Sequence, residues 1–349
     1  PGNCQFLPDF WHFGQRWQFV QSVPQVGLSS FRLPVICSSV HRTQPTFRLF
    51  VSVVFLCVAC FPAGVSGVEY TIIHDFSGAS GEGPRGGLVL GHDGRLYGTT
   101  QDPSVAFALN QNGSGYVVLR SFPPGQGPSG GVIQGSDNRI YGALYDGTGG
   151  RIYRIKTDGT VYQEISIFTV AVAGLNPNQP FEASNGKLFG ILSKGTILGK
   201  GGIFSMDLDG MNRGVLSLSG TAGANPGSTV YGDGDTESSG NLIEASSGLL
   251  YGVTPLGGQY DGGVIFRIQN DRSNYTLLRH LNSNSGTLPI HGLFQAANGR
   301  IYGVTQLGGR FGFGTIFGID PDGTGFKVIH HFNEVDGKDP GGGLVQGSD

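Results

Sequence analysis

DGRLYG at 93–98 recurs in this chain as DNRIYG at 137–142, NGKLFG at 185–190, SGLLYG at 247–252 and NGRIYG at 298–303. Each copy places turn-forming residues before an alternating run that holds an aromatic residue followed by glycine. Asp-Gly and Asn-Gly pairs tolerate the positive φ of a tight turn, so each copy predicts a β-hairpin. The hairpin aromatics recur 44 to 62 residues apart. A period near 40–50 residues is typical of propeller blades and far longer than a heptad.

The composition favours a turn-rich, all-β protein. Of 349 residues 62 are glycine, well above the usual share of about 7%. Charged residues make up 13%, about half of the usual ~25%. The glycines stand at fixed offsets between β-branched and aromatic runs, which indicates turns of short strands. A net charge of −3 gives no signal for binding polyanions, so nucleic acid is not an expected partner.

The first 67 residues are expected to lie outside the fold. They contain all four cysteines, so the repeat region has no disulfide and no thiolate metal site. Residues 49–61 form an apolar run with arginines before it and small residues after it. This layout predicts a secretory signal peptide cleaved after Gly67, and a chain that is secreted or held at the cell surface. An uncleaved anchor is the alternative, although spanning a bilayer takes about 20 residues. The protein would contact a membrane only through that uncleaved signal peptide, or through an anchor that this sequence does not include.

The fifth copy of the hairpin shows how one repeat unit is built. Strands are predicted at 292–297, 300–305, 315–320 and 326–332, with Asn298-Gly299 as a two-residue turn between the first two. Four short consecutive strands make one propeller blade. An aromatic residue recurs in the third strand of every unit, and we expect these side chains in the core: Phe107, Tyr153, Phe204, Phe266 and Phe317.

Two partial units flank the five complete ones. Residues 69–76 match a fourth strand, and residues 342–347 match a first strand. Propellers commonly close by completing one blade from both termini, which removes open sheet edges. The sequence therefore predicts an all-β propeller domain at 68–349, with five complete four-stranded blades and a partial sixth. A C-terminal truncation of a six-bladed ring is the simplest account, and a parent with more blades is the alternative.

The pattern resembles the GloVer (Gloeo–Verruco) tandem repeat. The best matches are GGLVLGHDGRLYGTT at 86–100 and NGRIYGVTQLGGRFGFGTIFGIDPDGT at 298–324, and the resemblance covers residues 69–349. It implies an exported, propeller-like repeat protein, and it carries no catalytic residues that can be transferred. The third unit departs from the pattern, because Phe189 replaces tyrosine and its loop between the second and third strands reads SKGTILGKGG.

One loop has the chemistry of a metal site. In GDGDTESSG at 232–240, Asp233, Asp235 and Glu237 alternate with short residues in an insertion that no turn requires. Alternate carboxylates can converge on calcium, which takes oxygen ligands. A solvated acidic loop is the simpler interpretation, so calcium is the only cofactor considered and none is required. His74, His280 and His331 recur near the end of the fourth strand, which favours a structural or surface role.

The loops between second and third strands are the expected binding face. They carry Tyr145, Tyr260, Asp261, Arg310, Phe311 and Phe313. Exposed aromatic rings beside polar groups suit carbohydrate, and a protein ligand is the other candidate partner. The alternative is that these rings fold back over the blade edges.

We therefore expect an exported, non-enzymatic scaffold that binds a ligand or partner through this face. The alternative function is an extracellular propeller hydrolase or lyase acting on polysaccharide. Such an enzyme needs a converging acid–base pair. The sequence supplies only a pool of carboxylates for it: Asp146, Glu182, Glu244 and Asp261.

Overall fold

The computed structural model describes residues 72–147, 149–169, 175–194, 196, 198, 200–224 and 242–347. All of its strands lie in one compact unit that includes Ile72–Gln346. The leader and signal peptide predicted for residues 1–67 fall outside the described residues. Within the described ranges, no helix has the length and apolar character needed to cross a membrane.

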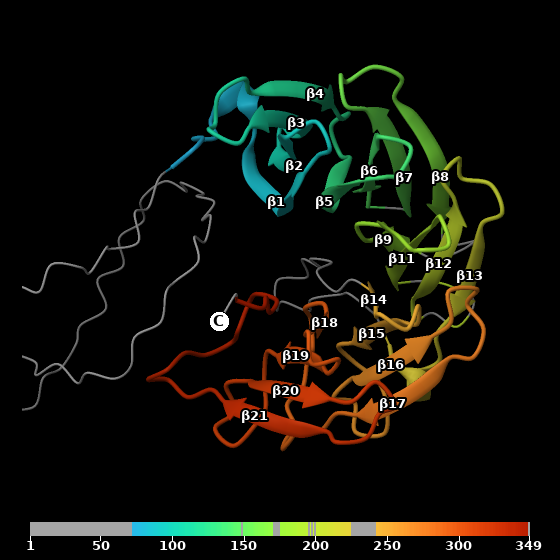
Figure 1. The fold of residues 1–349 in the computed structure, drawn as a ribbon, viewed down its shortest axis with the longest axis vertical. Helices are drawn as coiled ribbons and strands as arrows, with labels where there is room; N and C mark the ends of the chain where they lie inside the picture. The colour runs from blue at the N-terminus through green and yellow to red at the C-terminus, as the bar shows by residue number, and fades with distance from the viewer. Residues whose placement is uncertain are drawn as a thin grey trace, which may run out of the picture. The chain divides into compact units, whose positions relative to one another are not determined.

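Five antiparallel sheets follow one another along the described chain (Figure 1). The first contains β1 (Glu82–Leu90), β2 (Arg95–Asp102), β3 (Ser104–Asn110) and β4 (Val117–Ser121). The second contains β5 (Gly127–Gln134), β6 (Arg139–Tyr145), β7 (Gly149–Lys156) and β8 (Gln163–Thr169). The third contains β9 (Leu175–Pro177), β10 (Phe181–Glu182), β11 (Lys187–Lys194), β12 (Gly202–Asp207) and β13 (Gly214–Ser217).

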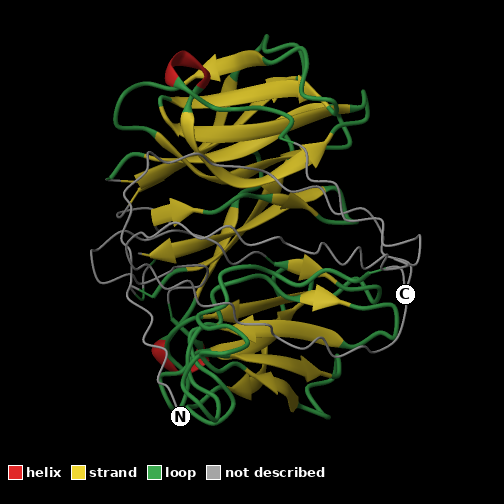
Figure 2. Ribbon diagram, turned by 90° about the vertical axis from the view of Figure 1, so that its left-hand side faces the viewer, coloured by secondary structure: helices red, strands yellow, loops and turns green. Residues whose placement is uncertain are grey.

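The fourth and fifth sheets have the same order. The fourth contains β14 (Ile243–Glu244), β15 (Leu250–Thr254), β16 (Val264–Ile268) and β17 (Thr276–His280). The fifth contains β18 (Phe294–Gln295), β19 (Ile301–Thr305), β20 (Thr315–Ile319) and β21 (Lys327–His331). Two short 3-10 helices, η1 (Gly78–Ser80) and η2 (Gly220–Ala222), are the only helices described (Figure 2). The all-β fold of four-strand units is thus confirmed. The third sheet counts five strands because its first strand is split into β9 and β10, which both pair with β11.

The turn between the first two strands of the fifth sheet differs from the prediction. In the fifth sheet the Ala296 N–H donates to the Arg300 carbonyl, and the Gly299 N–H donates to the Ala296 carbonyl. The loop therefore has three residues, with φ of 81° at Gly299, so the predicted two-residue Asn-Gly turn is wrong. The Asn298 side chain explains the longer loop, because its Oδ1 accepts the Arg300 N–H at 3.0 Å. This local bond holds Asn298 in the turn and leaves only glycine with positive φ.

The glycine that follows each hairpin aromatic is required by the third strand. A Cβ on Gly190 would lie 2.4 Å from the Phe204 ring, and one on Gly303 would lie 2.5 Å from the Phe317 ring. A Cβ added to the corresponding glycine of each of the other three sheets would lie 2.4 to 2.6 Å from the third-strand aromatic side chain. The aromatic-glycine pair of the motif therefore records one packing contact, in which a third-strand ring covers bare backbone of the second strand.

The predicted core aromatics are buried. Tyr97, Tyr141, Phe189 and Tyr251 are fully buried, and so are the third-strand rings named above. Four of the five clusters of buried residues draw on two successive sheets, as the cluster of Tyr141 and Phe204 does, and the fifth, around Phe107, lies at the first sheet. Tyr302 of the fifth sheet is the exception, since it is only half-buried. Burial between successive sheets is therefore the main source of stability.

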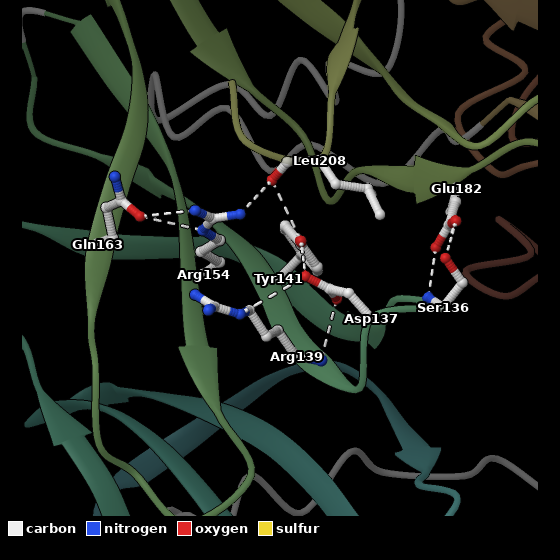
Figure 3. A network of polar contacts seen from close by, with 8 residues as sticks. All are labelled: Ser136, Asp137, Arg139, Tyr141, Arg154, Gln163, Glu182 and Leu208. Carbon is white, nitrogen blue, oxygen red and sulfur yellow. Dashed lines mark hydrogen bonds and ion pairs between the residues drawn. The ribbon is translucent and has the colours of Figure 1, made fainter. Parts of the chain in front are cut away.

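Each sheet is tied to the one before it by a side chain of its first strand. Glu182 of β10 accepts hydrogen bonds from the Ser136 N–H at 2.7 Å and the Ser136 hydroxyl at 2.6 Å (Figure 3). Glu182 stands seven residues before the hairpin aromatic of its unit, and the residue at that position accepts a backbone N–H from the preceding sheet's turn in other units too. Gln134 accepts the His92 N–H, Glu244 accepts the Ser184 N–H, and Gln295 accepts the Ser246 N–H. We call this contact the clamp. In the first sheet its register holds Leu90, an exposed side chain that cannot accept a hydrogen bond.

The partial units at 69–76 and 342–347 are not strands where the structure describes them. Residues 72–76 and 342–347 have no regular structure, so both strand predictions are wrong as secondary structure. The two segments nonetheless contact the sheets as strands would. Ile73 faces Gly113 as Leu119 faces Gly159, and the Gln346 side chain accepts the Ala297 N–H at 2.9 Å, as in the clamp. Neither segment has a neighbouring strand among the described residues to complete a ladder.

Candidate functional site

The loops between second and third strands in the fourth and fifth sheets share one design. The Gly258 N–H donates to the Gly220 carbonyl at 2.8 Å, and the Gly309 N–H donates to the Ser283 carbonyl at 2.7 Å. Gly220 and Ser283 belong to the connections that lead into each sheet, so these connections and loops lie on the same side. A Cβ on Gly257 would lie 2.6 Å from the Gly220 carbonyl. Glycine at this point therefore lets the loop approach the connection closely.

Histidines of the fourth strands hold the same loops. His280 Nδ1 accepts the Gln259 N–H at 3.1 Å, and His331 Nδ1 accepts the Arg310 N–H at 3.0 Å. An Nδ1 that accepts a hydrogen bond carries no proton. These two contacts confirm the structural role that the sequence predicted for His280 and His331, and they fix the loop residue next to each aromatic side chain.

The loop aromatics of these two sheets face solvent. Tyr260 is 56% exposed and Phe311 is 48% exposed, and they occupy equivalent positions in loops of equal length. The Arg310 guanidinium lies 5.4 Å from the centre of the Phe311 ring, within reach of a cation–π contact. Neither ring joins a core cluster, whereas side chains folded over a blade edge would be covered. The loops thus present an aromatic ring next to Gln259 in one sheet and next to Arg310 in the other.

Two other predicted residues help to shape these loops. Asp261 Oδ1 accepts the Gly257 N–H at 2.8 Å, and its own φ is 53°, so its carboxylate closes the loop. Phe313 is half-buried, and its carbonyl accepts the Asp339 N–H at 3.0 Å. These two residues position the loops, while Tyr260, Arg310 and Phe311 supply exposed contact groups.

Tyr145 stands apart from the other predicted binding residues. It ends β6 in the second sheet and is 38% exposed. Next to it, Arg151 bridges two carboxylates, pairing with Asp146 and, at 3.1 Å, with Glu164. Among the contacts of the described residues, the one that joins two members of the predicted binding set is that of Arg310 with Phe311, its neighbour in the chain.

The carboxylates named for an acid–base pair have structural partners. Glu182 and Glu244 each accept the N–H and hydroxyl of a serine in the clamp. Asp146 is paired with Arg151, and Asp261 closes its own loop. Within the described ranges, no group of three or more His, Cys, Asp or Glu side chains is placed to hold a metal ion. The predicted calcium ligands Asp233, Asp235 and Glu237 lie outside those ranges.

A cavity of about 400 Å³ lies among first-strand residues of several sheets. Its apolar lining includes Ile133 of β5, Phe181 of β10, Ile243 of β14 and Leu344, and its polar lining consists of Gln179 and His291. Burial lowers the pKa of His291 below its usual value, so the imidazole is neutral at pH 7. None of these cavity residues was predicted from the sequence to form a site.

A signal for the cavity was present in the sequence. His291 stands eleven residues before a hairpin aromatic, a register that holds glycine in three other units. Gln179 stands ten residues before Phe189, where the other units have glycine or asparagine. Aligning the units on the hairpin aromatic exposes both departures, whereas counting residue types does not.

Comparison with solved structures finds propeller-like neighbours. A virginiamycin B lyase from Staphylococcus aureus, solved with quinupristin, is 16% identical at a TM-score of 0.54, over 75% of this chain and 74% of that chain. An oligogalacturonate lyase from Vibrio parahaemolyticus is 8% identical at a TM-score of 0.49, over 74% of this chain and 68% of that one. At these identities the likeness concerns the fold alone. A search of curated proteins found no match.

The repeat itself is matched by a family model. The model of the Gloeobacter/Verrucomicrobia repeat matches residues 59–237 and 146–349, which together include all five sheets. The resemblance inferred from the hairpin motif is thereby confirmed. The chain belongs to the Gloeobacter/Verrucomicrobia repeat family.

Proposed function

We propose that this protein is an exported, non-enzymatic repeat scaffold that binds carbohydrate through the loops between second and third strands. One observation carries the proposal: Tyr260 and Phe311 are exposed at equivalent positions of two loops that are braced in the same way. Aromatic rings present a flat apolar face that can stack on the C–H face of a sugar. The neighbouring Gln259 and Arg310 can hydrogen-bond to hydroxyl groups. A scaffold that varies its loop chemistry is a common way of building a binding site.

We include the closed fold in this proposal. The five sheets would be complete blades of a β-propeller. In a sixth blade, residues 72–76 would take the place of the fourth strand and residues 342–347 that of the first strand. The contacts of Ile73 with Gly113 and of Gln346 with Ala297 support this, because they repeat contacts made by true fourth and first strands. Export rests on the apolar run at 49–61 and is tested by sequencing the N-terminus of the secreted protein.

The catalytic alternative has less support. Each carboxylate in the pool for an acid–base pair is engaged by a serine, an arginine or a loop N–H. A group committed to holding two sheets together is poorly placed to exchange protons with a substrate. Binding is therefore the better interpretation of the loop face.

A glycan array compares the wild-type chain with a double variant, Tyr260→Ala with Phe311→Ala. Because both rings are exposed, the substitutions should leave the unfolding transition unchanged, while glycan binding weakens by about 1–3 kcal/mol. The matched control is Val161→Ala with Met211→Ala, which removes two exposed apolar side chains from turns between third and fourth strands.

The control variant should bind as the wild type does. Equal binding by wild type and the Tyr260/Phe311 variant would remove the site from these loops. If the wild type binds no glycan on the array, the carbohydrate proposal is wrong.

A further inference from the structure

The cavity among the first strands is built from a different set of residues than the loop face. Ile133, Phe181, Ile243 and Leu344 come from four separate segments and supply an apolar lining. Its volume of about 400 Å³ lies within the range of about 300–1,000 Å³ that is usual for small-molecule sites. Such sites are mostly apolar with a few placed polar groups. This cavity has that character, so its polar groups decide what it can bind.

His291 is the polar group that lacks a use within the protein. Its Nε2 is buried and has no hydrogen-bond partner among the described residues. Gln179, by contrast, is already engaged, because its Nε2 donates to the Val132 carbonyl at 3.1 Å. A buried polar atom without a partner destabilises the folded state, and native proteins contain few of them.

The residues at the position of His291 in other units indicate that the unpartnered nitrogen is not a requirement of the fold. The same register holds Gly86 in the first sheet and Gly130 in the second, so an imidazole is not needed to form a sheet of this kind. The connection into the fifth sheet therefore carries a half-buried imidazole, with a buried Nε2, that the fold does not require. A ligand that bonds to Nε2 would account for it.

The chemistry of the described lining disfavours a charged ligand. None of the described residues around the cavity carries a carboxylate, an ammonium or a guanidinium group. Moving a charge from water into such surroundings is strongly unfavourable when no opposite charge is present. The neutral imidazole offers a single hydrogen bond to an otherwise apolar guest.

We propose that this cavity binds a small, neutral, mostly apolar molecule whose hydroxyl group hydrogen-bonds to His291 Nε2. This site is separate from the loop face, and it goes beyond the proposed carbohydrate-binding function. The class is that of aromatic or cyclic alcohols, in which a flat apolar body meets the aliphatic and phenyl lining and one polar group meets the imidazole.

The test is an NMR titration of the full chain, labelled with 15N-histidine, using three probes of similar size: p-cresol, toluene and benzoate. We expect p-cresol to shift the Nε2 resonance of His291. Toluene, which lacks the hydroxyl, should bind about tenfold more weakly, since one hydrogen bond is lost. Benzoate, which is charged, should not bind at the same concentrations.

Two variants locate the effect. His291→Gly introduces the residue that three other units have. In a titration followed on the NMR signals of p-cresol itself, it should lower the affinity about tenfold relative to wild type, to the level of toluene, without preventing folding. His92→Gln changes an exposed histidine of a turn in the first sheet and should leave p-cresol binding unchanged. Equal p-cresol affinity in His291→Gly and wild type would overturn the proposal. So would the absence of any shift at millimolar p-cresol, or tighter binding of benzoate than of p-cresol.

Discussion

The contact between the second and third sheets differs from that between the third and fourth. In the first of these, Tyr141 and Arg154 both donate to the Leu208 carbonyl, at 3.2 and 3.0 Å (Figure 3). In the second, Phe189 has no hydroxyl, and Asn185 donates to the Asn270 carbonyl at 2.8 Å. Both acceptors lie in the turn between third and fourth strands of the following sheet. Each contact thus has a side-chain donor at this carbonyl, and residues at different registers supply that donor.

The largest loss of unfolding free energy is expected from substitutions at a feature that both contacts share. Gly142 and Gly190 both lie under a third-strand aromatic side chain, and a Cβ added to either glycine would come within 2.4 Å of it. Replacing either with alanine should cost about 1–3 kcal/mol of unfolding free energy, because the ring must shift in a packed core. Urea denaturation measures the loss. Gly87→Ala is the matched control, since nothing would lie within 4 Å of its Cβ. A loss at Gly190 no larger than at Gly87 would refute the packing account.

The next effect probes the donor that replaces tyrosine. Asn185→Asp keeps an acceptor for the Lys187 N–H, which Asn185 Oδ1 binds at 3.0 Å, but removes the donor to Asn270. We expect a loss of about 0.5–1.5 kcal/mol, the usual net contribution of one hydrogen bond. Thermal and urea unfolding of the two proteins give the difference. An unchanged midpoint would show that the Asn270 carbonyl needs no donor.

Adding a second change should convert one contact into the other. Asp137 and Tyr141 of the second sheet stand at the registers of Asn185 and Phe189. The single proton of the Tyr141 hydroxyl is shared between Asp137, at 2.8 Å, and the Leu208 carbonyl, at 3.2 Å. The double variant Asn185→Asp with Phe189→Tyr should therefore be about 0.5–1 kcal/mol more stable than Asn185→Asp alone. A double-mutant cycle measures this coupling, and strictly additive losses would contradict the exchange of donors.

The smallest effect concerns the clamp that both contacts share. Glu182→Gln should change the unfolding free energy by less than about 0.5 kcal/mol, because glutamine is the acceptor in other sheets, at Gln134 and Gln295. Glu182→Ala removes the acceptor and should cost about 1 kcal/mol. If both variants lose the same amount, the clamp depends on the charge of Glu182 and not on its acceptor oxygen.

The sequence predicted the units and their core well because both depend on local patterns. The strand alternation and the aromatic-glycine pair are each contained within a few residues, and the sheets followed them. The turn at Asn298-Gly299 was predicted wrongly, since a side-chain hydrogen bond to the Arg300 N–H sets its length. The exposure of Tyr260 and Phe311 agreed with the prediction, whereas the roles of Glu182 and Glu244 did not emerge. Their partners lie 46 and 60 residues away, so only the packing of successive sheets reveals them.

The clamp also bears on how such a chain can change its length over evolutionary time. Its acceptor always comes from the sheet that follows, and its donor from the turn of the sheet before. A duplicated unit would bring one acceptor and one donor, so every junction would stay satisfied, and loss of a whole unit would leave the remaining junctions matched in the same way. Leu90, which cannot accept, limits this freedom at the first sheet. Among the second to fifth units, copy number can thus vary by recombination without a compensating substitution in the clamp.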